Sequence, residues 1–166
     1  MRGRILMVGV LVAALALVVV AGCGKSGGGG VGGGRLSKSE YQKQVQAEGK
    51  KIRDAFQSLT PQNATDFKAL AKSVRKGQTE LNKAADQLGK INPPSDIEGP
   101  HRDLVAAMHE LADELGPFAD ALETADTKKI NAASQKISKS AAVKKAQKAV
   151  ADIKKKGYDL GVIGQN

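Results

Sequence analysis

Apolar residues recur at steps of three and four along most of the chain after residue 37, the period of one face of an α-helix. The pattern is most regular over residues 67–91, where a helix capped by Asn63 or Thr65 is expected. Pro93 and Pro94 should end it. Its seam comprises Phe67, Leu70, Val74, Gly77, Leu81, Ala84, Leu88 and Ile91.

Two further helical segments open with the same signal, a Ser followed three residues later by a Glu. This pairing predicts a capping box at Ser37 with Glu40 and another at Ser95 with Glu98. The first segment should end before Pro61 and bury Tyr41, Val45, Ile52, Phe56 and Leu59. The seam of the third comprises Ile97, His101, Leu104, Met108, Leu111, Leu115, Phe118, Leu122 and Ala125.

Gly116 and Pro117 interrupt the third segment. Proline lacks an N–H and its ring crowds the preceding turn, so we expect a kink or a break there. A kink is favoured because the seam continues in phase. A gap beside it would be a candidate ligand pocket, although a plain kink is the simpler interpretation.

A fourth segment, residues 127–156, has a weaker stripe whose phase slips between Ile137 and Val143. Gly157 can end it in a left-handed cap, and the apolar tail 158–163 should fold back on the other helices. Four amphipathic segments with short connections predict an all-α, up-down-up-down four-helix bundle over residues 35–166.

The first 22 residues have a different pattern. Arg2 and Arg4 precede an apolar run from Ile5 to Val20, the layout of a secretory signal peptide. An uncleaved transmembrane helix is the alternative, because the 17 residues from Ile5 to Ala21 are barely enough to cross a bilayer.

Val20, Ala21, Gly22 and Cys23 resemble the lipobox of bacterial lipoproteins. The resemblance implies cleavage between Gly22 and Cys23, and a lipid on the Cys23 thiol that holds the protein on the extracytoplasmic face of the cell membrane. Residues 23–34 would then be a lipidated Cys and a flexible linker, since eight of the eleven residues 24–34 are Gly. Its root-mean-square reach would be roughly 20 Å.

A second resemblance involves the domain itself. Pro93 and Pro94, then His101 and Leu104, and finally residues 160–162 (Leu-Gly-Val) are similar to a pattern in uncharacterised small helical lipoproteins of actinobacteria. Many members of that group carry a Cys near the closing Gly, where this chain has Ile163. The group implies no activity.

Charge is unevenly distributed along the chain. The net charge is +9, with +6 over residues 35–94, −7 over 95–125 and +7 over 126–166. We expect this pattern to help neighbouring helices pair. The alternative is a strip facing an anionic envelope polymer or lipid, formed by Lys144, Lys145, Lys148, Lys154, Lys155 and Lys156. Nucleic acid is not expected as a partner, because no aromatic residues interleave with these lysines.

The sequence offers little for catalysis. Cys23 is the only cysteine, and neither a glycine-rich nucleophile turn nor a phosphate loop is present. Glu98 and His101 have the spacing of di-iron ligands but lack a second such motif, so we expect a neutral seam histidine and no metal. His109 and Asp113 should form a solvated pair. The sequence therefore predicts a non-catalytic, cofactor-free binding or structural module attached to the membrane by a lipid.

Overall fold

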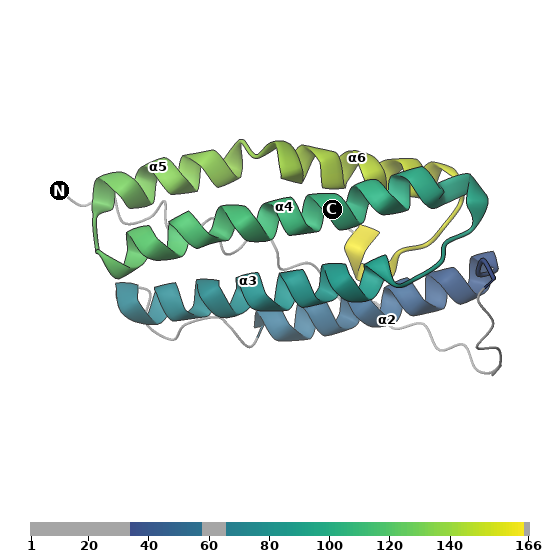
Figure 1. The fold of residues 1–166 in the computed structure, drawn as a ribbon, viewed down its shortest axis with the longest axis horizontal. Helices are drawn as coiled ribbons and strands as arrows, with labels where there is room; N and C mark the ends of the chain where they lie inside the picture. Colours follow the sequence, from purple (N-terminus) through teal and green to yellow (C-terminus); the bar gives the residue numbers. More distant parts are fainter. Residues whose placement is uncertain (1–33, 58–65, 165–166) are drawn as a thin grey trace.

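The computed structural model of the chain describes residues 34–57 and 66–164. They form an all-α bundle without strands in the described ranges, which confirms the predicted fold class (Figure 1). The helices are α2 (Lys38–Gln57), α3 (Phe67–Gly89), α4 (Glu98–Glu123), α5 (Thr127–Ser138) and α6 (Ala141–Lys155), with short 3₁₀ helices η1 (Ser95–Ile97) and η2 (Gly161–Gly164).

Helices α3 and α4 form the centre of the bundle. Helix α2 contacts α3 and the tail helix η2, whereas α5 and α6 pack end to end along α4. Figure 1 shows α2 on one long edge of the molecule and the α5–α6 pair on the opposite edge. We call this pair the fourth arm, from Thr127 to Lys156.

Two groups of buried side chains form the core. The larger draws on α2, α3, α4, α6 and the tail, and its fully buried members include Tyr41, Leu88 and Ile153. The smaller, with Leu70, Leu122 and Ile130, joins α3, α4 and α5. Both groups, as far as the described residues show them, lie within residues 34–164, and we expect the segment 34–166 to fold by itself.

Of the two predicted capping boxes, only the first is present. At the first, the Ser37 N–H donates to Glu40 Oε2 at 2.9 Å, and the Glu40 N–H donates to Ser37 Oγ at 3.4 Å, as predicted. The second is wrong, because Ser95 begins η1 and α4 follows Ile97 without a side-chain cap. Glu98 instead accepts from Arg35 at 2.7 Å.

The predicted caps of α3 are also corrected. Asn63 and Thr65 lie outside the described residues, and Asp66 caps α3 by accepting from the N–H groups of Lys68 and Ala69, both at 3.0 Å. A carboxylate directly before the first helical residue satisfies two donors that the helix leaves free.

The fourth segment is two helices, not one. Ser140 separates them and caps α6 by accepting from the N–H groups of Ala142 at 3.0 Å and Val143 at 3.3 Å. The break explains the phase slip between Ile137 and Val143, because each helix can turn its own apolar stripe towards α4.

Helix α4 runs through Pro117 without interruption, so a break at this position is excluded. A Cβ on Gly116 would lie 3.4 Å from Gln78 Nε2 of α3. The Gln78 side chain of α3 therefore lies against α4 at this position.

The end of α6 and the tail follow the prediction. Gly157 has φ +80°; its N–H donates to the Lys154 carbonyl at 2.8 Å, and the Tyr158 N–H donates to the Ile153 carbonyl at 3.4 Å. This is a Schellman cap, which needs a left-handed residue at the glycine position. Beyond it, Tyr158 and Leu160 are buried in the larger core.

Candidate functional site

Gly22 and Cys23, the predicted cleavage and lipidation positions, lie outside the described residues. What the structure does show is how the domain begins. The Leu36 N–H donates to the Asn92 carbonyl at 2.9 Å, and Arg35 donates to the Pro93 carbonyl at 3.3 Å. The first residues after the glycine tract are thus held against the loop between α3 and η1.

The predicted strip of six lysines lies on α6 and its C-cap. Acidic side chains of the same protein neutralise part of its charge. Lys145 contacts Glu110 of α4 at 2.8 Å. Lys148 and Lys155 share Asp152 at 2.7 Å and 3.5 Å, and this pairing raises the pKa of Lys148 and lowers that of Asp152. Lys144, Lys154 and Lys156 are exposed. The six therefore do not act as one unpaired cluster.

The acidic side of α4 is matched to its neighbours. Arg75 of α3 contacts Asp120 at 2.6 Å and Glu123 at 2.9 Å, and its hydrogen bond lowers the pKa of Glu123. Together with the Lys145–Glu110 pair, these contacts agree with the expectation that charge helps the helices to pair. Such exposed pairs favour one register of the helices more than they stabilise the bundle.

His101 is buried with both ring nitrogens engaged. Its Nε2 lies 3.0 Å from the Leu88 carbonyl, which can only accept, so Nε2 carries the proton. Nδ1 then accepts from the Tyr41 hydroxyl at 3.0 Å. Burial lowers the His101 pKa, opposed by the Leu88 hydrogen bond. The histidine is therefore neutral and structural, as its position on the seam predicts.

The network continues to the tail. The Tyr41 ring meets the Tyr158 ring edge-on, with centroids 5.6 Å apart, and the Tyr158 hydroxyl donates to Asp96 at 2.8 Å. Burial and this hydrogen bond raise the pKa of Tyr158 to about 12. The sequence analysis did not identify Asp96 and Tyr158 as parts of this network. The only signal was the apolar tail, which indicated that residues after α6 would pack on the other helices.

The structure does not assemble a metal site from the described residues, among which no three His, Cys, Asp or Glu side chains cluster suitably. Glu98 is engaged by Arg35. His109 does not pair with Asp113 as expected; its Nδ1 lies 3.0 Å from Asn82 Oδ1 and its Nε2 3.5 Å from Asp86. Both partners are on α3, because position 109 of α4 faces that helix.

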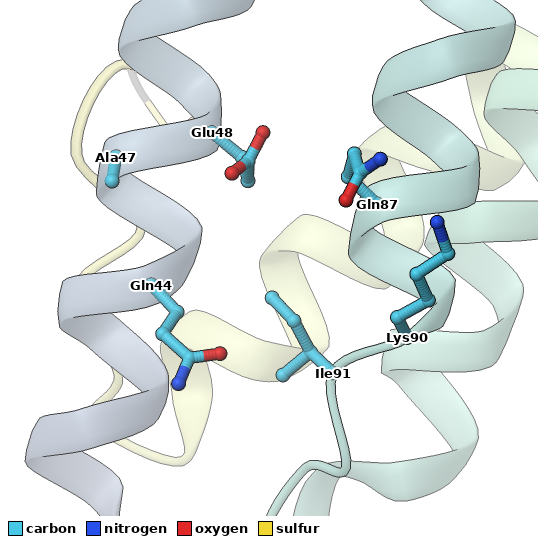
Figure 2. Close-up of a pocket in the computed structure, with 6 residues that line it drawn as sticks. All are labelled: Gln44, Ala47, Glu48, Gln87, Lys90 and Ile91. Carbon is cyan, nitrogen blue, oxygen red and sulfur yellow. The ribbon is translucent and has the colours of Figure 1, made fainter. Parts of the chain in front are cut away.

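A groove of about 300 Å³ separates α2 from α3 near the tether end. Figure 2 shows Glu48 and Gln87 approaching each other across it, with Ile91 between the helices. Glu48 is engaged by Lys51 at 2.7 Å, and most of the lining is exposed. The groove is lined by Gln44, Ala47, Glu48, Gln87, Lys90 and Ile91, so it offers amides and ionic groups on an open polar surface.

A second groove of about 260 Å³ shares Ile91 and is lined further by Gly89, Pro93, Glu98, His101, Arg102 and Val105. His101 forms part of its wall, but both ring nitrogens are already bonded within the protein. His101 therefore offers this groove no free ring nitrogen.

None of the described helices has the length and apolar character to cross a bilayer. Comparison of the chain with protein-family models, with curated proteins and with solved structures found no match.

Proposed function

We propose that this protein is a lipid-anchored lipoprotein of the bacterial cell envelope, in which a helical bundle acts as a non-catalytic binding or structural module. The observation that carries the proposal is the run Val20-Ala21-Gly22-Cys23 at the end of an apolar segment. A thiol at that position can carry a diacylglyceryl group, and a second acyl chain would make membrane attachment firm.

The arrangement of the domain supports this proposal. The bundle begins immediately after the glycine tract, and Arg35 is fixed to the loop before η1 and to Glu98. A linker that ends at such a fixed point can carry a folded domain clear of the lipid headgroups. The described residues 34–57 and 66–164 already supply two groups of buried side chains that join all the helices, which supports a domain that folds beyond the linker.

The absence of catalysis is part of the proposal and rests on how the polar groups are used. His101 is bonded to Tyr41 and Leu88, and His109 to Asn82. A general base needs a free lone pair within reach of a substrate proton, which His101 does not offer.

The anchor is tested by Cys23→Ser in the full chain, with Ser26→Ala as the matched control. Cys23→Ser should abolish incorporation of labelled palmitate and leave an unprocessed precursor, whereas Ser26→Ala should be labelled and processed like the wild type. The proposal is wrong if Cys23→Ser is still cut before residue 23 and still partitions with the membrane lipids.

A further inference from the structure

The fourth arm has an excess of positive charge that the bundle does not use. Between Thr127 and Lys156 the chain has ten lysines and one acidic residue, Asp152. Helices α2 and α3 together have ten basic and five acidic residues. Nine of the ten lysines on the arm are exposed: Lys128, Lys129, Lys136, Lys139, Lys144, Lys148, Lys154, Lys155 and Lys156.

Internal pairing accounts for part of this charge. Lys129 lies 3.9 Å from Asp126, and Glu110 and Asp152 engage three lysines of α6. Besides Lys156 at the C-cap of α6, four exposed lysines of the arm have no ion pair or side-chain hydrogen bond within the described residues. They are Lys128, Lys136, Lys139 and Lys144, which extend from the first turn of α5 to the first turn of α6.

The unpaired charge is therefore centred on α5 and the junction at Ser140. The six-lysine strip expected from the sequence began only at Lys144. Helices of 12 and 15 residues, placed end to end, give an arm of about 40 Å. Figure 1 shows the arm lying along one long edge of the molecule. Its charge is thus spread along a line, which suits an extended ligand better than a compact one.

The exposed side chains between these lysines are small or polar, as at Asn131, Gln135 and Ser138. The exposed positions of α5 and α6 include no aromatic and no large apolar side chain. Such a surface can attract phosphates and donate hydrogen bonds, but it cannot stack on rings or insert into acyl chains.

The position of the arm disfavours the anchoring membrane as its partner. The linker joins the bundle before α2, and Lys38 in the first turn of α2 donates to the Lys156 carbonyl at 3.5 Å, so the linker lies near the C-terminal end of the arm. The four lysines begin about 18 Å further along α6, at Lys144, and continue along α5, so bringing all of them to the membrane would use much of a linker reach of roughly 20 Å. A partner beyond the membrane surface meets the arm without this constraint.

We propose that Lys128, Lys136, Lys139 and Lys144 bind a linear polyanion of the cell envelope whose phosphate groups repeat along its chain. The proposal rests on the proposed function for the location of the protein, whereas the surface itself belongs to the described bundle. Each lysine replaces counterions condensed on the polymer, so affinity falls steeply with salt concentration.

The test measures binding of the segment 34–166 to soluble inorganic polyphosphate. The arm variant changes four unpaired lysines to glutamine: Lys128, Lys136, Lys139 and Lys144. A matched control changes four exposed lysines of α2 and α3 that also lack a described partner: Lys43, Lys50, Lys68 and Lys72. Circular dichroism verifies that both variants remain helical.

We expect the arm variant to lose at least about 30-fold in affinity at about 50 mM salt, and the control to lose less than about 3-fold. The slope of log K against log salt should fall by about 3 in the arm variant only. Equal losses in the two variants would mean that net charge alone is responsible, and would overturn the proposal. Absence of binding by the wild-type segment at low salt would also overturn it.

A second measurement uses vesicles of equal parts phosphatidylglycerol and phosphatidylcholine. If the same segment binds these vesicles more tightly than polyphosphate, and through the same lysines, the membrane is the partner and the proposal is wrong. The outcome is independent of Cys23, which the segment lacks. Failure of anchoring and failure of polyanion binding are therefore distinguished.

Discussion

Acidification below about pH 6.5 should destabilise the bundle through His101. The neutral ring satisfies both of its partners, since Nε2–H donates to Leu88 and Nδ1 accepts from Tyr41. A proton on Nδ1 would remove the acceptor of the Tyr41 hydroxyl, and burial penalises the charge. The folded-state pKa of His101 is therefore below its usual value of 6.5.

The sign and magnitude follow from proton linkage. Below pH 6.5 the unfolded chain binds a proton at this position before the folded chain does, so the free energy of unfolding decreases as the pH falls. One group contributes at most about 1.4 kcal/mol per pH unit until the folded-state pKa is reached. Glu40, Glu123 and Asp152 have lowered pKa values and lose their contributions only at more acidic pH.

The assay is urea unfolding of the segment 34–166, followed by circular dichroism between about pH 7.5 and 5. His101→Gln should be less stable by about 2 kcal/mol at neutral pH, because buried hydrogen bonds are disrupted. Its stability should then change less with pH than that of the wild type. His109→Gln, on the same helix, is the matched control for the replacement of a histidine. Parallel slopes for wild type and His101→Gln would refute the reasoning.

Two further substitutions test the ends of α6 by thermal unfolding. Ser140→Ala should reduce the free energy of unfolding by about 1 kcal/mol, because the N–H groups of Ala142 and Val143 lose their acceptor; Ser138→Ala is the exposed control, and equal effects would count against the cap. Gly157→Ala should cost about 1–2 kcal/mol, because φ is +80° there, whereas at Gly89 an added Cβ would be 3.5 Å from Val105 and no positive φ opposes it. A Gly157→Ala protein as stable as Gly89→Ala would contradict the assigned left-handed cap.

Local sequence patterns predicted much of the fold because the interactions behind them span only one or two helical turns. The seam of α3 and the Ser37–Glu40 cap depend on residues three or four apart, and both are present. The sequence also shows the phase slip between Ile137 and Val143. It indicates two helices only once Ser140 is identified as the cap of the second.

Predictions from local spacing were wrong where a residue distant in the sequence competed for the same polar side chain. Ser95 and Glu98 have the spacing of Ser37 and Glu40, yet Glu98 pairs with Arg35, which is 63 residues away. His109 likewise binds Asn82 and Asp86 across the α3–α4 contact and not Asp113 on its own helix. Which of several partners a polar group takes depends on distances that sequence spacing does not contain.

The sequence by itself determined that the chain forms amphipathic helices, that the third is acidic beside basic neighbours, and that a lipobox-like run precedes a glycine tract. Helical periodicity and charge are properties of the chain, so they can be read before it folds. Only the tertiary structure decided that Tyr158 returns to Tyr41, that His101 is bonded on both sides, and that most unpaired lysines of the arm lie between the first turn of α5 and the first turn of α6. Each of these depends on which surfaces meet when the helices pack.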